Sequence, residues 1–128
     1  MQNLFKFDKL NFITAGMPIR TGKGSYPQAF DVLKEMNLDG MELEFVHGVR
    51  MSDDNRIFVK EMAKNFVITA HGPFYINLNS KEEEKIEASV QRIIDTAAVA
   101  AQAGAFSITY HAAFYMGGDK ETVFEQVK

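Results

Sequence analysis

Short apolar runs alternate with longer amphipathic stretches along this chain. The runs lie at residues 10–16, 41–46, 67–71 and 106–113, and each is short enough to be a strand. Between them, apolar positions recur at intervals of three and four residues, which is the spacing of a helix. This succession of strand–helix units predicts parallel strands joined by right-handed crossovers.

Helices are expected at residues 25–37 and 54–66, between residues 80 and 104, and from residue 119 onward. Ser25 is the expected N-cap of the first helix. Ser80 and Glu83 have the spacing of a capping box for the third helix, and Gly104 is expected to end it. The apolar positions of the third helix predict its buried face, which comprises Ile86, Val90, Ile93, Ile94, Ala97 and Ala101.

The last three strands are each expected to have one apolar and one polar face. The apolar faces carry Met41, Leu43, Phe45, Ile68, Ala70, Phe106, Ile108 and Tyr110. The polar faces carry Glu42, Glu44, Thr69, His71, Ser107, Thr109 and His111. An open doubly wound sheet has helices on both faces and needs strands that are apolar throughout, whereas a barrel turns polar groups inward near its C-terminal mouth.

This pattern therefore favours a half-barrel of four βα units, the N-terminal half of a parallel (β/α)₈ TIM barrel, as a single α/β domain over residues 1–128. A complete barrel has about 250 residues, and the pattern is still running at Lys128, so we expect a truncated chain. The alternative is a small self-contained three-layer α/β domain.

The amino-acid composition limits which metal ligands and which binding partners the chain can have. The chain has no cysteine, so a bound metal would use imidazole, carboxylate or water, which suits zinc, manganese or iron. The net charge of −3 argues against non-specific binding of a polyanion but leaves room for a local basic patch.

No apolar stretch reaches the length of a membrane span, and residues 1–5 lack the features of a signal peptide. We therefore expect a cytoplasmic protein that does not enter a membrane.

His71 and His111 end neighbouring strands in the same phase, two residues after a threonine in each case. Neighbouring strands lie about 5 Å apart, so two such imidazoles can bind one divalent ion. A catalytic zinc has three protein ligands, and Glu44 is the carboxylate nearest the mouth, whether as a ligand or as a catalytic residue. Glu42 is expected in a buried polar network, and His47 in the loop after the second strand.

Three parts of the chain resemble the endonuclease IV family of apurinic/apyrimidinic-site nucleases, which are xylose isomerase-like TIM barrels, and in particular its archaeal branch. They are HGPFYINLN at residues 71–79, GAFSITYH at 104–111, and MELEFV with GVRM at 41–46 and 48–51. The first is similar to the family's H-x-P-x-x-I-N-L segment, and the second to its fourth strand, which ends in His-Pro-Gly. This chain has His111-Ala112-Ala113 instead, and its first strand offers Thr14-Ala15-Gly16 without a histidine.

The resemblance implies a zinc-dependent phosphodiesterase of DNA base-excision repair that cuts DNA 5′ to an abasic site with three zinc ions. His71 and His111 match two family histidines that bind one of these ions, and Phe74 matches an aromatic residue that helps to hold distorted DNA. Arg50 corresponds to a basic loop after the second strand. Further basic candidates for DNA contact are Arg20 and Lys23 in the first βα loop. The remaining ligands lie on later strands in the family, so the 128-residue chain alone is expected to be inactive.

Two other functions fit the same residues. Related barrels that isomerise or epimerise sugars also place histidines and carboxylates around a divalent ion, and Glu44 would then be a candidate base. Alternatively, the chain is a non-catalytic half-barrel whose open edges and uncovered inner face drive self-association, with two copies forming a homodimer.

Overall fold

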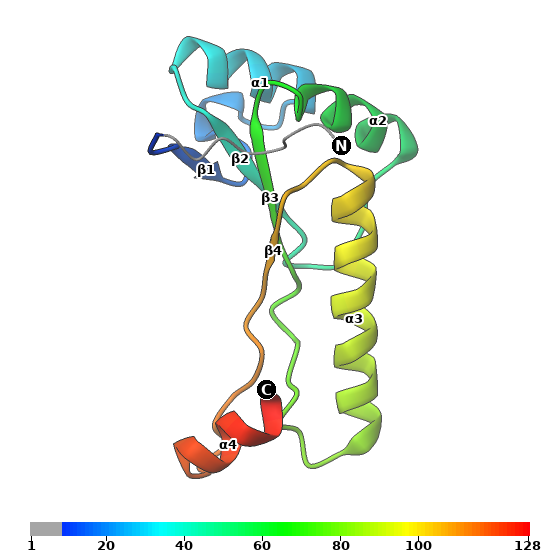
Figure 1. The fold of residues 1–128 in the computed structure, drawn as a ribbon. Helices are drawn as coiled ribbons and strands as arrows, with labels where there is room; N and C mark the ends of the chain where they lie inside the picture. Colours follow the sequence, from blue (N-terminus) through cyan, green and yellow to red (C-terminus); the bar gives the residue numbers. More distant parts are fainter. Residues whose placement is uncertain (1–8) are drawn as a thin grey trace.

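The computed structural model describes residues 9–128, in which strands and helices alternate strictly (Figure 1). The strands are β1 (Ile13–Ala15), β2 (Gly40–Glu44), β3 (Val67–His71) and β4 (Ile108–Thr109). The helices are η1 (Ile19–Thr21, a 3₁₀ turn), α1 (Tyr26–Glu35), α2 (Asp53–Met62), α3 (Glu83–Gln102) and α4 (Lys120–Val127). Residues 1–5, on which the expectation of no signal peptide partly rests, lie outside the described residues. Within residues 9–128, no helix combines the length and apolarity needed to cross a membrane.

The four strands form one parallel sheet in the order β1-β2-β3-β4. Each strand pairs with the next along the chain, and a helix connects them, so the predicted succession of parallel βα units is confirmed. β2 and β3 pair over their full lengths, from Gly40 opposite Val67 to Glu44 opposite His71. This central pair of strands sets the positions of the polar side chains described below.

The hydrophobic core lies between the sheet and the helices. Met41, Leu43, Ile68 and Ala70 are at most 1% exposed, as the alternation along the second and third strands predicted. They belong to one cluster with Ala29, Phe30 and Leu33 of α1, Val59 of α2, and Ala100 and Ala103 at the end of α3. Figure 1 shows α3 running alongside β3 and β4, and the two described edges of the sheet are β1 and β4.

The first and fourth strands are much shorter than predicted. Residues 10–16 yield only β1, and residues 106–113 yield only the two residues of β4. Both are edge strands of the described sheet, with a ladder on one side only, and this limits how far pairing extends. Phe106 was expected on the buried face, but it is 47% exposed.

Helix α3 differs from its prediction at its start. Its N-cap is Glu82 rather than Ser80, so the predicted capping box is wrong. The Ser80 hydroxyl instead accepts a hydrogen bond from the backbone N–H of Glu82 within the preceding loop, at 3.2 Å. The other predicted caps are confirmed, because Gly104 follows α3 with φ +77° and Ser25 caps α1. Gln28 Oε1 accepts from the backbone N–H of Ser25 at 2.8 Å.

The buried face of α3 is also rotated relative to the prediction. The helix buries Ser89, Thr96 and Ala100, whereas Val90, Ile94, Ala97 and Ala101 are exposed. Ser89 and Thr96 can be buried because each hydroxyl donates to the carbonyl four residues earlier, at 2.7 Å in both cases. These short side chains suit a close approach of the helix to the chain after β3, where Gly72 and Pro73 are buried.

Candidate functional site

One face of the sheet carries polar side chains. The register places Glu42 beside Thr69 and Glu44 beside His71 on β2 and β3, and it places His71 beside Thr109 on β4. These residues alternate with the buried ones, so they project from the face opposite the hydrophobic core. Thr69 Oγ1 donates to Glu42 Oε2 at 3.4 Å, so Glu42 is part of a half-buried polar network on this face, as expected.

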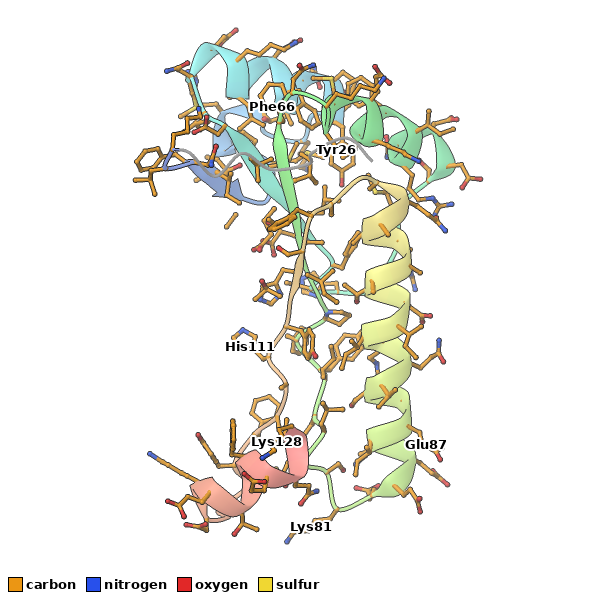
Figure 2. The ribbon with its side chains drawn as sticks, in the orientation of Figure 1. Tyr26, Phe66, Lys81, Glu87, His111 and Lys128 are labelled. Carbon is orange, nitrogen blue, oxygen red and sulfur yellow. The ribbon has the colours of Figure 1, made fainter. Side chains whose placement is uncertain are left out.

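His71 and His111 lie side by side. Their ring centroids are 5.3 Å apart, and the ring planes are inclined by 49°. His111 does not stand level with His71, because Thr109 occupies that position and His111 comes two residues later. The even offset keeps both imidazoles on the same face, and Figure 2 shows His111 projecting from the chain on the side away from α3. The structure therefore brings the two rings together, and their role as metal ligands stays a prediction.

The His71 ring has one nitrogen available for a metal. Its Nδ1 lies 2.8 Å from the carbonyl oxygen of Gly72. Because a carbonyl oxygen can only accept, Nδ1 carries the proton in this contact, and the lone pair of the neutral ring is on Nε2. Such a bond from the far ring nitrogen is the usual way in which a metal-binding imidazole is oriented. The donor set of this pair thus fits two positions of a zinc site.

Glu44 is the carboxylate nearest the histidine pair in register. Partial burial raises its pKa, the charge of Glu42 raises it further, and the nearby His71 acts in the opposite direction. Gly16, at the end of β1, makes room for it, since a Cβ at this glycine would lie 3.0 Å from Glu44 Cγ. Gly16 has φ +77°, a signal that the sequence pattern alone did not reveal.

An aromatic cluster lies in the loops after β2 and β3. Phe74 is 55% exposed and makes edge contacts with Tyr75 and with His47, at centroid distances of 5.2 and 6.1 Å. His47 is an exposed residue of the loop after β2, as expected. The guanidinium of Arg92, on α3, lies 4.7 Å from the centre of the Tyr75 ring. Phe74 is therefore largely exposed beside two aromatic neighbours, one of which, Tyr75, also contacts a cation.

The basic residues singled out from the sequence have different surroundings. Arg50 is exposed, and its Nε, like the Tyr75 hydroxyl, lies within 4.0 Å of where a Cβ on Gly48 would be. Arg50 thus lies at the edge of the aromatic cluster. Arg20, in η1, pairs with Glu35 at 3.5 Å, which partly neutralises it. Lys23 is exposed in the loop before α1.

Two asparagines that sequence reasoning left without a role connect the loops after β3 and β4. Asn77 and Asn79 hydrogen-bond to the backbone of Phe114. Their signal in the sequence was the I-N-L-N run, whose contacts the sequence could not reveal.

Among residues 9–128 there is no cluster of three or more histidine, aspartate, glutamate or cysteine side chains that could hold a metal ion. The histidine pair thus offers two candidate ligands, and within the described residues Glu44 does not complete a set of three.

Comparison with known proteins identifies the family to which this chain belongs. The model of one protein family, described as a xylose isomerase-like TIM barrel, matches residues 30–128. The chain belongs to this family. It is also 43% identical, over 119 residues, to an uncharacterized protein of Methanocaldococcus jannaschii. That alignment covers 93% of this chain and 42% of the relative, so the chain spans well under half the length of the protein it matches.

The solved structures that are similar to this chain in fold include both epimerase-type proteins and an endonuclease. A D-tagatose 3-epimerase-like protein and endonuclease IV from Thermus thermophilus each match with a TM-score of 0.65 and 18% identity. D-psicose 3-epimerase, solved in the presence of D-fructose, matches with a TM-score of 0.64 and 16% identity. Each match covers 91% of this chain and 44% of the other protein. Membership of the xylose isomerase-like TIM barrel family and the predicted fold are confirmed. The finer resemblance to endonuclease IV stays a prediction, because the epimerase and epimerase-like structures are as similar in fold as endonuclease IV.

Proposed function

We propose that the protein containing this chain is a zinc-dependent endonuclease of DNA base-excision repair, which hydrolyses the phosphodiester bond 5′ to an abasic site. The observation that carries the proposal is the pair formed by His71 and His111, whose rings lie 5.3 Å apart on the polar face of the sheet. The sequence resemblance of residues 71–79 to the endonuclease IV family favours DNA as the substrate.

His71 and His111 are the residues that would hold the ion, zinc or another divalent metal such as manganese. Bound there, such an ion would neutralise phosphate oxygens and supply a hydroxide near neutral pH. The bond from His71 Nδ1 to the Gly72 carbonyl holds that imidazole in a single tautomer and orientation. The ligands that complete the site belong to the part of the protein beyond these residues.

Phe74 and Arg50 are the residues proposed to contact DNA. An exposed aromatic ring can insert at an unstacked step, and this costs least where a base is already missing. Phe74 is held for such a contact by its edge interactions with Tyr75 and His47. Arg50, near the Tyr75 hydroxyl at the edge of the aromatic cluster, supplies a local positive charge in a chain whose net charge is −3.

The second candidate function is a metal-dependent sugar isomerase or epimerase. The observation that favours it is Glu44, which stands opposite His71 and has a raised pKa. A carboxylate with a pKa moved toward neutrality is suited to act as a general base on a carbon-bound proton. The similarity of the fold to a 3-epimerase and to a 3-epimerase-like protein is equally consistent with this function.

The deciding experiment uses the full protein with zinc, an abasic-site oligonucleotide and a panel of ketoses. We expect cleavage 5′ to the abasic site, lost on chelation and in His71→Ala and His111→Ala. In a zinc titration, His47→Ala is the matched control, because this exposed loop histidine lies outside the pair and should retain zinc binding. It is not a control for cleavage, since His47 contacts Phe74, a residue proposed to bind DNA. Ketose epimerisation without DNA cleavage would replace the nuclease by the second candidate. The 128-residue chain alone should show little or no cleavage, and robust cleavage by it would contradict the assignment of further ligands beyond Lys128.

A further inference from the structure

His111 lies on a stretch of chain that the sheet itself does not hold. β4 ends at Thr109, and the last ladder bond runs from the Gly72 N–H to the Thr109 carbonyl, at 2.8 Å. The next backbone bond to the neighbouring loop joins the Leu78 N–H to the Ala112 carbonyl, at 2.9 Å. His111 is therefore placed by two attachments, one on either side of it.

The second attachment is extended by two side-chain amides. Asn77 Oδ1 accepts from the backbone N–H groups of Asn79 and Phe114, at 3.2 Å each. Asn79 Nδ2 donates to the carbonyl of Phe114 at 2.9 Å and to that of Tyr115 at 3.4 Å. Both asparagines thus bond the same short loop that follows His111.

The asparagines are themselves anchored. Ile76, immediately before them, is fully buried, and the Asn77 N–H donates to the hydroxyl of the buried Ser89 at 3.0 Å. The Ser89 hydroxyl in turn donates to the Lys85 carbonyl of α3 at 2.7 Å. The loop after β4 is therefore fixed, through the asparagines, to the longest helix of the described chain.

We infer that Asn77 and Asn79 are positioning residues, which hold the loop after β4 so that the His111 ring stays against that of His71. The inference deepens the proposed function and rests on it for the metal, but the position of the ring can be measured without any metal. The two asparagines act through opposite groups, an acceptor in Asn77 and a donor in Asn79. This difference provides a matched pair of variants.

Asn77→Asp keeps the oxygen that accepts from Phe114, whereas Asn79→Asp replaces a donor with an oxygen that faces two carbonyls. Both variants add the same negative charge, and Asn65→Asp adds it in the exposed turn after α2 as a control. Asn79→Ala removes the donor without adding charge. A thermal melt followed by circular dichroism checks that each variant is folded.

The first measurement, without metal, is the nuclear Overhauser effect between the ring protons of His71 and His111. We expect it in the wild type, Asn77→Asp and Asn65→Asp, and its loss in Asn79→Asp and Asn79→Ala. The second is zinc titration by calorimetry, where both Asn79 variants should bind about tenfold more weakly or worse, as is typical for residues that orient a metal ligand.

The two measurements separate the two claims. A wild type that shows the ring contact but does not bind zinc would refute the metal site and leave the first measurement to decide the positioning role. An Asn79→Asp variant that keeps the ring contact would overturn the inference. So would an Asn77→Asp variant that loses it as completely as Asn79→Asp does.

Discussion

Replacing Gly40 with alanine tests the arrangement of the two central strands. A Cβ at this position would lie 1.8 Å from the Val67 carbonyl oxygen, 2.7 Å from its carbonyl carbon and 2.9 Å from its nitrogen. These are backbone atoms, so no side-chain rotation relieves the clash, and the strands must move apart by about 1 Å. The neighbouring bond from the Val67 N–H to the Asp39 carbonyl, now 2.8 Å, would then exceed hydrogen-bonding distance.

Overpacking of this kind costs about 1–3 kcal/mol, and the lost hydrogen bond adds about 1 kcal/mol. We therefore expect Gly40→Ala to lower the free energy of unfolding by about 3 kcal/mol in urea titrations followed by circular dichroism. Gly117→Ala is the matched control, because Gly117 has φ +76° but no neighbouring atom within 4 Å. This control variant loses stability only through its positive φ, by about 1–2 kcal/mol. Equal losses in the two variants would refute the close contact between β2 and β3.

Four further outcomes are expected. Leu33→Ala, at a fully buried position, should lower the free energy of unfolding by about 2–5 kcal/mol in the same titration. Ile94→Glu should change it by less than about 0.5 kcal/mol because this side chain is 54% exposed, and a loss of several kcal/mol would restore the helix face that the sequence pattern predicted. The hydrogen bond from Lys9 Nζ to Asp39, with a second from the Phe12 N–H, lowers the pKa of that carboxyl below its ordinary value. Its stabilising contribution is therefore present above the unfolded pKa and lost as the pH falls through the folded pKa, so the wild-type melting temperature should drop more steeply than that of Asp39→Asn below about pH 4. We also propose that the uncovered polar face and the β1 and β4 edges of the described sheet drive self-association, so light scattering should give a mass above 14.4 kDa, and a monomer at high concentration would exclude it.

The alternation of apolar and polar residues was enough to predict the parallel sheet and its two faces. Along β2, Leu43 is buried while Glu42 and Glu44 project from the other side, because the side-chain period of a strand is fixed by its backbone. The same argument placed His71 and His111 on one face. These predictions follow from the alternation of side chains along each strand, so they need no information about the neighbouring strands.

The orientation of α3 could not be predicted in the same way. Hydrophobic periodicity gives most weight to Val90 and Ile94, but these residues are about half exposed, while Ser89 and Thr96 are buried. Burial of these two residues depends on one local fact and one tertiary fact. Locally, each hydroxyl donates to the carbonyl four residues earlier in its own helix. Only the tertiary structure shows that these small side chains face the buried segment after β3.

The histidine pair shows why phase was predictable and register was not. Each histidine follows a threonine by two residues, which gave the phase of the two strands but not their register, and in the structure Thr109 rather than His111 pairs with His71. An offset of one residue would have turned His111 to the helix side of the sheet, whereas an even offset leaves the face unchanged.

The loop attachments also bear on the departure of His111-Ala112-Ala113 from the His-Pro-Gly of the endonuclease IV family. They use the carbonyl of Ala112, which a proline would also provide, and the N–H of Phe114, which lies beyond the tripeptide. The substitution of both residues is therefore compatible with the same placement of His111.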